Sequence, residues 1–365
     1  MHILVDARKA FDSGIGTYIR GVVPGVMNRL HDHAFTVLMK AGYPPPFGNA
    51  LRPGITYMAV EDAPFGLREQ WGLRRAQHTD PPVDAFWVTS LAHPLWTRAP
   101  LIATIHDVVQ LVPQAGRGGG LPVRAAARVF LQSLRSHADL LMFNSDFTRS
   151  EFERCVGTSR GRQVVTPLGV ASDWFSRREK PPAAARPYFL CVTSWRAHKN
   201  LAFLLAAFAA VHRQVPHELV IVGADASRAD AQCASLGDRI RWLGSLSDEA
   251  LKGVVSSANA MVLPSLYEGF GLPALEAMAA GCPVLASRIG AFVEVCGDAA
   301  DYFDPHDQQS LIAALADQAA RDPEQVDALR RRGIERARRF TWERTVDLTS
   351  EAIASFPTLR TSERR

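Results

Sequence analysis

Short apolar runs alternate with helical patterns along this chain, and the alternation restricts its fold more than any other feature. The first series of runs covers His2–Ala7, Phe35–Lys40, Ala85–Val88, Leu101–Ile105, Leu140–Phe143 and Val164–Thr166. The second covers Tyr188–Thr193, Glu218–Val222, Ile240–Leu243, Ala260–Leu263 and Pro283–Ala286. Strands that are each followed by a helix pair in parallel, because a parallel connection needs a long crossover. The pattern therefore predicts an α/β fold with mostly parallel sheets.

A charged stretch rich in Pro and Ala, Ser176–Pro187, separates the two series and is typical of a linker. At 365 residues the chain is too long for one ordinary core. We predict one domain over residues 1–176, a second over 187–341, and a final helix with a basic tail over 342–365. We expect two doubly wound domains that face a central cleft. Because ligands of such sheets bind beyond the carboxyl ends of the strands, the cleft is the expected site.

The composition indicates a globular protein that remains in the cytoplasm. Hydrophobic residues make up 47% and charged residues 21%, with a formal net charge of +4. The first residues read as a strand rather than a signal peptide, and no apolar run reaches the ~20 residues of a membrane-spanning helix. The five cysteines are scattered without a C-x-x-C pair, which disfavours a disulfide framework and a zinc site.

The richest motif runs from Tyr267 to Glu276 and reads Tyr-Glu-Gly-Phe-Gly-Leu-Pro-Ala-Leu-Glu. Pro273 suits the first turn of a helix, and the glycines before it let the backbone turn sharply near a ligand. Free amides at a helix start attract anions. One of the two acids, Glu268 or Glu276, could reach a reacting sugar or other polar group, while the other could accept hydrogen bonds from ligand hydroxyls. A plain helix start with acids favoured by the dipole is the alternative.

A second motif, Ser194-Trp-Arg-Ala-His-Lys-Asn200, lies between a predicted strand and a predicted helix. Arg196 and Lys199 would then lie beside free amides, an arrangement that suits a diphosphate. The chain has no Asp-x-Asp pair and no histidine spacing for a metal, so we expect a metal-independent site without a cofactor. The alternative is two exposed basic residues.

The first half holds two weaker motifs. Thr104-Ile-His-Asp107 ends a predicted strand, which places His106 where it could bind a substrate hydroxyl; Asp107 could hold this histidine or cap the next segment. The glycine turn up to Gly16 could cradle a phosphate. It lacks a third glycine, and no acid follows about 20 residues later, which disfavours a nicotinamide dehydrogenase.

A predicted helix after Gly120 carries Arg124, Arg128 and Arg135 within a narrow sector. Such a stripe could contact anionic lipid on the inner face of the membrane. A solvated helix face is the alternative. Nothing indicates a nucleic-acid partner.

The segment from Tyr267 to Met278, followed by Gly-Cys-Pro-Val at 281–284, resembles the E-x7-E segment of retaining GT-B glycosyltransferases of family 4. Shorter motifs occur in the family's order: Gly14-Ile-Gly16, Thr104-Ile-His-Asp107, Asn144-Ser-Asp-Phe-Thr-Arg149, Pro167-Leu-Gly-Val170, His198-Lys-Asn200, Trp242-Leu-Gly244 and Phe340-Thr-Trp342. One departure is that the family often has a basic residue at the position of Ser194, whereas here the arginine is Arg196.

The resemblance implies the GT-B fold, with a final helix from about Trp342 that crosses back onto the first domain. It also implies metal-independent transfer of a sugar, with retained configuration, from a nucleotide diphosphate donor to an acceptor hydroxyl. Similarity to bacterial polysaccharide mannosyltransferases suggests GDP-mannose as donor and a glycan or lipid-linked oligosaccharide as acceptor. The residues implied for donor binding and catalysis are Gly16, His106, Arg196, Lys199, Glu268, Gly269, Phe270, Gly271, Leu272 and Glu276. His106 and Glu268 would contact the donor sugar, Lys199 the diphosphate, and Glu276 the ribose.

Two other classes of protein stay open. A nucleotide-sugar epimerase of related architecture would isomerise its donor without an acceptor. A catalytically silent subunit would bind a nucleotide sugar without turnover.

Overall fold

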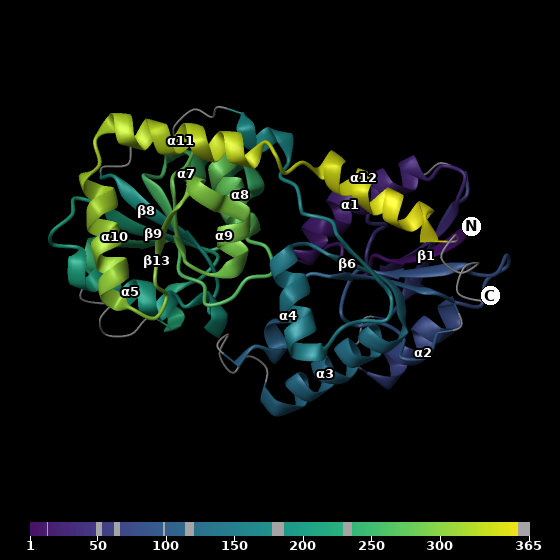
Figure 1. Cartoon of the computed structure of the whole chain (residues 1–365). Coiled ribbons are helices and arrows are strands. Elements are labelled where there is room, and N and C mark those ends of the chain that lie inside the picture. Colours follow the sequence, from purple (N-terminus) through teal and green to yellow (C-terminus); the bar gives the residue numbers. More distant parts are fainter. Residues whose placement is uncertain are drawn as a thin grey trace. The chain divides into compact units, whose positions relative to one another are not determined.

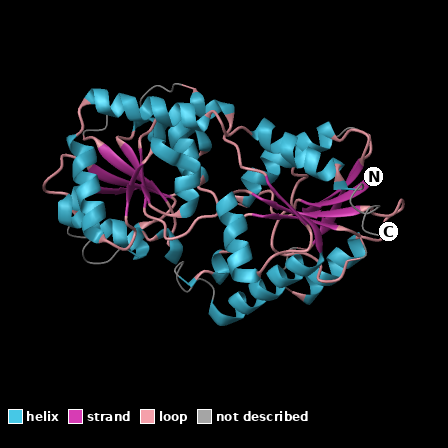
Figure 2. Cartoon of the chain, viewed as in Figure 1, coloured by secondary structure: helices cyan, strands magenta, loops and turns pink. Residues whose placement is uncertain are grey.

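The computed structural model of the chain describes residues 1–12, 14–48, 53–61, 66–97, 99–113, 120–176, 186–228 and 236–356. These form two compact units (Figure 1). Each unit has a parallel sheet with helices on both faces, as the secondary-structure colouring makes clear (Figure 2). The predicted fold of two Rossmann-like α/β domains is therefore confirmed.

The sheet of the first unit has seven strands in the order β3-β2-β1-β4-β5-β6-β7, all paired in parallel. Their bounds are β1 His2–Asp6, β2 Ala34–Lys40, β3 Ile55–Val60, β4 Ala85–Val88, β5 Leu101–Ile105, β6 Ala138–Phe143 and β7 Arg162–Val165. The central strands β1, β4 and β5 are fully buried, which explains their continuous apolar runs.

Within the described residues, five helices cover this sheet: α1 Ile15–Arg29, α2 Leu67–Ala76, α3 Gly120–His137, α4 Asp146–Val156 and α12 Trp342–Ala354. Helices α1 and α12 lie on one face, and α2, α3 and α4 on the other (Figure 1). The C-terminal helix α12 therefore belongs to the first unit, where it packs on α1. The contact is close because Gly21 and Gly25 leave room for Trp342 and Val346.

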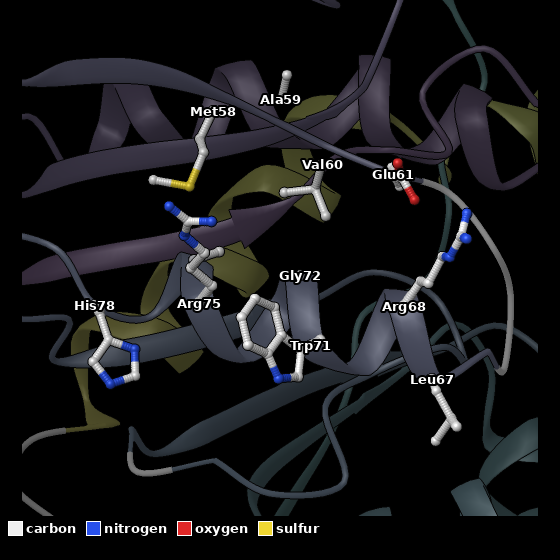
Figure 3. A pocket seen from close by; sticks show the side chains of 11 residues that line it. Met58, Ala59, Val60, Glu61, Leu67, Arg68, Trp71, Gly72, Arg75 and His78 are labelled. Atoms are coloured by element: carbon white, nitrogen blue, oxygen red, sulfur yellow. The ribbon is translucent and has the colours of Figure 1, made fainter.

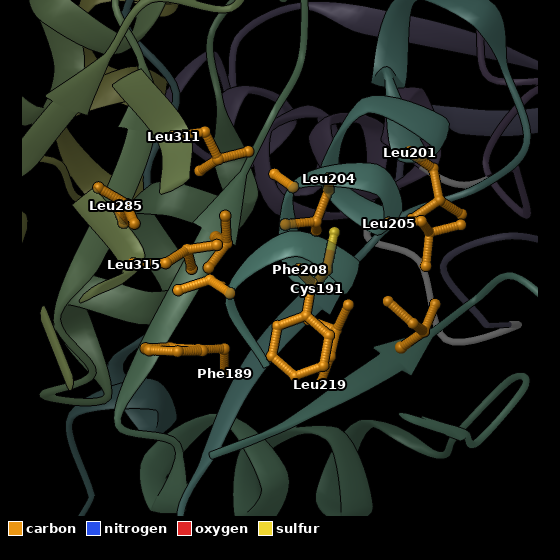
Figure 4. Close-up of a cluster of buried hydrophobic side chains, with 14 of the residues drawn as sticks. Phe189, Cys191, Leu201, Leu204, Leu205, Phe208, Leu219, Leu285, Leu311 and Leu315 are labelled. Carbon is orange, nitrogen blue, oxygen red and sulfur yellow. The ribbon is translucent and has the colours of Figure 1, made fainter. Parts of the chain in front are cut away.

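The second unit has a six-stranded parallel sheet in the order β10-β9-β8-β11-β12-β13. Its strands are β8 Tyr188–Val192, β9 Glu218–Val222, β10 Ile240–Trp242, β11 Ala260–Leu263, β12 Val284–Ser287 and β13 Asp301–Phe303. Its helices are α5 Leu201–Val211, α7 Asp248–Ser257, α8 Leu272–Ala279, α9 Gly290–Cys296, α10 Gln308–Ala320 and α11 Pro323–Ala337. One face of the sheet packs on α5 and α10 through a buried cluster that includes Phe189, Phe208 and Leu311 (Figure 4).

Short 3₁₀ turns occur in both units, at Val109–Leu111, Ser172–Phe175, Ala197–Lys199, Ala226–Arg228, Gly237–Arg239 and Gly297–Ala299.

The chain passes between the two units at Gly169 and Val170 and at Phe340 and Thr341, and the described residues Val112 and Pro113 are also grouped with the second unit. The predicted linker began at Ser176, and residues 177–185 lie outside the described part of the chain. Residues 170–176 belong to the second unit because they are fixed there by side-chain and backbone contacts. Val170 N donates to Phe340 O at 3.1 Å, Asp173 forms an ion pair with Lys252, and Trp174 is buried.

Candidate active site

The order of strands in the second unit places two loops together. Strand β8 lies beside β11, and the chain leaves β8 toward β9 through α5 but leaves β11 toward β12 through α8, so the two connections run in opposite directions along the sheet. Such a switch point leaves a crevice at the carboxyl ends of the strands, where α/β proteins bind ligands. The loops after β8 and β11 carry the two motifs of residues 194–200 and 267–276.

Lys199 and Glu268 meet at this switch point. Lys199 Nζ lies 2.7 Å from Glu268 Oε1, and Ser265 Oγ donates to the same oxygen at 2.6 Å. The side chains of Lys199 and Glu268 are 21% and 14% exposed, so both can still reach a ligand. Among the described residues no group hydrogen-bonds Glu268 Oε2. The pair thus offers a cation and a carboxylate oxygen at one point.

The backbone also joins the two loops, since Leu266 N donates to His198 O at 2.7 Å. Asn200 adopts the left-handed conformation, with φ 55°, where α5 begins. Burial lowers the pKa of His198; Glu268 opposes this shift, and Lys199 and Arg196 add to it.

Arg196 lies exposed at the start of the same turn. Within the described part of the chain its side chain has no hydrogen-bond or ion-pair partner. It therefore remains available to an anion, beside Lys199.

The turn into α8 requires a glycine at position 271. Gly271 has φ 108°, and a Cβ there would lie 2.9 Å from the ring of Phe292. Gly269 precedes it in the same loop, and Leu272 is half-buried at the first helical position. The side chain of Phe270 is buried edge-on against Phe340, with ring centroids 5.8 Å apart, so its ring contributes to packing.

Glu276 lies on α8, one turn beyond this loop. Burial raises the pKa of its carboxyl to about 8; Asp248 acts in the same direction and Lys252 opposes it. Among the described residues no group hydrogen-bonds the carboxyl of Glu276, whose backbone carbonyl accepts from Ala280 N at 3.0 Å. Glu276 is largely protonated at pH 7 and has unused hydrogen-bonding capacity.

His106 follows β5 in the first unit. Its Nε2 donates to Thr89 O at 3.1 Å, and its carbonyl accepts a 2.7 Å bond from Asn144 Nδ2. The Tyr18 ring packs edge-on at 4.8 Å. Burial lowers the pKa of His106 to about 4, against the effect of the Thr89 carbonyl. The neutral ring therefore has Nδ1 as an acceptor for a ligand hydroxyl.

Asp107 does not hold this histidine. Its Oδ1 accepts a 3.0 Å bond from Val109 N, so it caps the following 3₁₀ turn.

Gly16 is explained by packing within the first unit. It is buried in the first turn of α1, and a Cβ there would lie 2.6 Å from Ala10 O. The close approach of the helix to its own preceding loop therefore requires glycine, whatever the loop binds.

The sequence did not reveal a buried ionic cluster at the end of β1. Arg8 forms ion pairs at 2.7 Å with both Asp6 and Glu69, and all three side chains are at most 2% exposed. Arg8 Nη2 also approaches Ala92 O at 3.4 Å. The cluster holds the loop after β1 to α2. The Asp6-x-Arg8 spacing is visible in the sequence, but Glu69 is remote from it.

The three arginines predicted to face a membrane have different environments on α3. Arg128 is exposed and Arg124 is half-buried. Arg135 donates to Gln132 Oε1 at 3.1 Å and lies beside Gly157 at the end of α4.

The described residues contain no group of three His, Cys, Asp or Glu arranged to hold a metal. Within the same residues, no helix is both long and apolar enough to cross a membrane.

Two family models match the chain, one on each unit. The Glycosyl transferase 4-like domain matches residues 13–169, and the Glycosyl transferases group 1 model matches residues 172–340. The junction between the two matches coincides with the passage from the first unit to the second.

Two curated relatives are mannosyltransferases. O-antigen chain mannosyltransferase B of Escherichia coli is 33% identical over 245 residues, 63% of this chain and 64% of the relative. MMP alpha-(1->4)-mannosyltransferase of Mycolicibacterium hassiacum is 32% identical over 275 residues, 71% of this chain and 61% of the relative. The matches thus span less than two thirds of the length of either relative.

Among solved structures, sucrose-phosphate synthase from Thermosynechococcus elongatus aligns with a TM-score of 0.76 and 21% identity. The alignment covers 98% of this chain and 100% of that structure, so the fold is shared over the whole length. With a family model on each unit and relatives of the same kind, this chain belongs to family 4 of the GT-B glycosyltransferases.

Proposed function

We propose that this protein transfers a sugar from a nucleoside diphosphate donor to a hydroxyl group of a glycan or a lipid-linked oligosaccharide. The observation that carries the proposal is the contact of Lys199 with Glu268 at the switch point of the second sheet. A cation and a carboxylate at one point match the two ends of a nucleotide sugar, its diphosphate and its hydroxyls. Family membership and the two mannosyltransferase relatives favour the same reaction.

In this proposal Lys199, Arg196 and the amides of the turn into α8 stabilise the diphosphate. The charge that develops on the leaving phosphate is met by these fixed positive groups, without a metal. Glu268 accepts hydrogen bonds from the donor sugar, and Glu276 contacts the ribose. His106 accepts a further sugar hydroxyl at Nδ1. Their contribution is positioning and electrostatic stabilisation, with no obligatory covalent intermediate.

The configuration at the anomeric carbon is retained in our proposal, by attack on the face from which the diphosphate leaves. The departing phosphate oxygen accepts the proton of the incoming hydroxyl, so the new glycosidic bond forms as the sugar–phosphate bond breaks. The two mannosyltransferase relatives favour GDP-mannose as the donor. The setting is the synthesis of a bacterial polysaccharide in the cytoplasm.

We also propose peripheral contact with an anionic membrane through Arg124, Arg128 and Arg135. The exposed position of Arg128 supports this role, whereas the contact of Arg135 with Gln132 leaves it less available.

The proposal is tested first by ligand binding and then by transfer. GDP, UDP and ADP are screened by thermal shift; a ligand at a hundred times its dissociation constant stabilises by about 2.7 kcal/mol. Lys199→Ala should abolish the shift, whereas Arg332→Ala, which removes an exposed cation from α11, should preserve it. Transfer from GDP-mannose is then followed with EDTA present. A donor isomerised without acceptor would instead indicate an epimerase, and binding without transfer to an acceptor panel a silent subunit.

A further inference from the structure

Exposed large hydrophobic side chains concentrate on one helical layer of the first unit. Leu67 and Trp71 on α2 are 89% and 69% exposed, and Trp96, after β4, is 75% exposed. Three more lie on α3: Leu121, Val123 and Val129. We call these six residues the α2–α3 face. Elsewhere in the described chain only Phe11, Tyr43 and Val293 are comparably exposed.

Hydrogen bonds hold α2, the segment that bears Trp96, and α3 together. Gln70 Nε2 donates to His93 O at 2.9 Å, and Gln70 Oε1 accepts from Leu95 N at 2.8 Å. On the other side, Ser133 Oγ lies 3.1 Å from His93 Nε2, and the His93 ring packs edge-on against Phe130. The elements that carry Trp71 and Trp96 are thus joined to each other and to α3.

The surface is hollowed beside α2. A groove of about 830 Å³ lies between α2 and the edge strand β3, with Trp71, Arg75 and Met58 among its lining residues (Figure 3). Leu67, Trp71 and Arg75 are spaced four residues apart and so share one stripe of the helix. A second hollow of about 720 Å³ contains Arg74 and Trp96. His78 lines both, so the two hollows adjoin.

The charge around these hollows is predominantly positive. Arg68, Arg74 and Arg75 are exposed, and none of them has an ion-pair partner in the described part of the chain. The acidic residues that line the two hollows are Glu61 and Asp80. Unpaired guanidinium groups beside exposed tryptophans are complementary to a partner that has both anionic and apolar groups.

We propose that the α2–α3 face docks on an anionic phospholipid bilayer, with Trp71 and Trp96 at the level of the headgroups and Arg68, Arg74 and Arg75 on lipid phosphates. Tryptophan favours the membrane–water interface because its ring is amphipathic, and basic side chains are attracted to anionic lipid. The inference rests on the proposed membrane contact of the first unit, but it is independent of sugar transfer. It places the anchoring side chains on α2 and beside β4, not only on the arginine stripe of α3.

The test is co-sedimentation of the full chain with vesicles of phosphatidylcholine containing about 30 mol% phosphatidylglycerol, and with phosphatidylcholine alone. Trp71→Ala/Trp96→Ala should lower the partition coefficient about tenfold or more on the anionic vesicles. Arg68→Gln/Arg74→Gln/Arg75→Gln should lower it about a hundredfold and remove its dependence on the anionic lipid. Tyr43→Ala controls for loss of an exposed aromatic residue. Arg331→Gln/Arg332→Gln/Arg338→Gln on and beside α11 makes the same charge change and should have little effect.

Four results decide the question. Wild-type binding by the double tryptophan variant overturns the inference, and so does equal loss of binding in the two arginine triples. If only Arg124→Gln/Arg128→Gln weakens binding, the inference fails while the contact proposed for α3 stands. Displacement from vesicles by a soluble oligosaccharide would indicate a glycan site instead. A thermal shift with nucleoside diphosphate, unchanged in the tryptophan variant, shows that its fold and donor site are intact.

Discussion

The Nζ of Lys199 lies 2.7 Å from Oε1 of Glu268, across the two loops that leave the adjacent strands β8 and β11. A partly exposed ion pair of this kind contributes at most about 1 kcal/mol to stability. We therefore assign its importance to ligand binding. A diphosphate that engages Lys199 competes with Glu268 for the same ammonium group, so removal of the carboxylate should separate binding from catalysis.

Glu268→Gln should reduce turnover by about two to three orders of magnitude, because the amide lacks the charge that meets the donor sugar. The same change should leave the binding of bare nucleoside diphosphate equal or tighter, since Lys199 loses its competitor. Steady-state kinetics and calorimetric titration measure the two effects. Glu335→Gln, which replaces an exposed acid on α11, is the control. Normal turnover of Glu268→Gln would remove Glu268 from the site.

The carboxyl of Glu276 should make stability depend on pH. Its pKa is raised from 4.5 to about 8, so between these values the folded chain holds a proton that the unfolded chain releases. Stability therefore falls as pH rises through this window. The free energy of unfolding of Glu276→Gln should equal that of wild type near pH 5. Near pH 8.5 it should exceed that of wild type by about 1–3 kcal/mol. Urea unfolding at the two pH values measures this; an equal difference at both would show that Glu276 does not titrate in this window.

His106 should not produce a step in activity near its usual pKa. Burial lowers that pKa from 6.5 to about 4, so the ring stays neutral from about pH 5 upwards. Loss of an uncharged acceptor by His106→Ala should lower kcat/KM by about tenfold at every pH. A ratio of mutant to wild-type kcat/KM that changes around pH 6.5 would mean that His106 works as a proton carrier.

The same lowered pKa has a consequence for stability. Between pH 4 and 6.5 the unfolded chain binds a proton at this histidine that the folded chain does not. The contribution of His106 to the free energy of unfolding is therefore lost as pH falls through this range. His93 and His217 have pKa values of about 4 for the same reason, burial, and act in the same direction. The chain should therefore lose stability steeply below about pH 6.

Two helical glycines should respond oppositely to alanine. At Gly21 a Cβ would lie 2.8 Å from the ring of Trp342, so Gly21→Ala should destabilise the packing of α12 on α1 by about 1–3 kcal/mol. At Gly253, on α7, nothing lies within 4 Å, and Gly253→Ala should gain up to about 1 kcal/mol of helix propensity. Chemical denaturation compares the two. Equal effects would show that α12 does not pack as described.

The buried strands could be predicted because strands covered on both faces need continuous apolar side chains. The edge strands β3 and β13 were not predicted, because they lack such a continuous apolar run. Strand β3 is largely half-exposed, and β13 has only three residues, so neither forms such a run. The role of Gly271 at the start of α8 could also be predicted, because a left-handed backbone position with no room for a Cβ strongly favours glycine.

The local motifs alone indicated which residues could bind a phosphorylated sugar. A cation at a helix start and an acid near a glycine turn each lie within a few consecutive residues, so the sequence shows them directly. The pairing of Lys199 with Glu268, 69 residues apart, depends on β8 lying beside β11. The burial of Phe270 and the cluster of Arg8 with Glu69 depend likewise on contacts between remote segments. Strand order is fixed by the packing of the whole sheet, because each helix must cover a shared apolar face, and no local pattern carries that information.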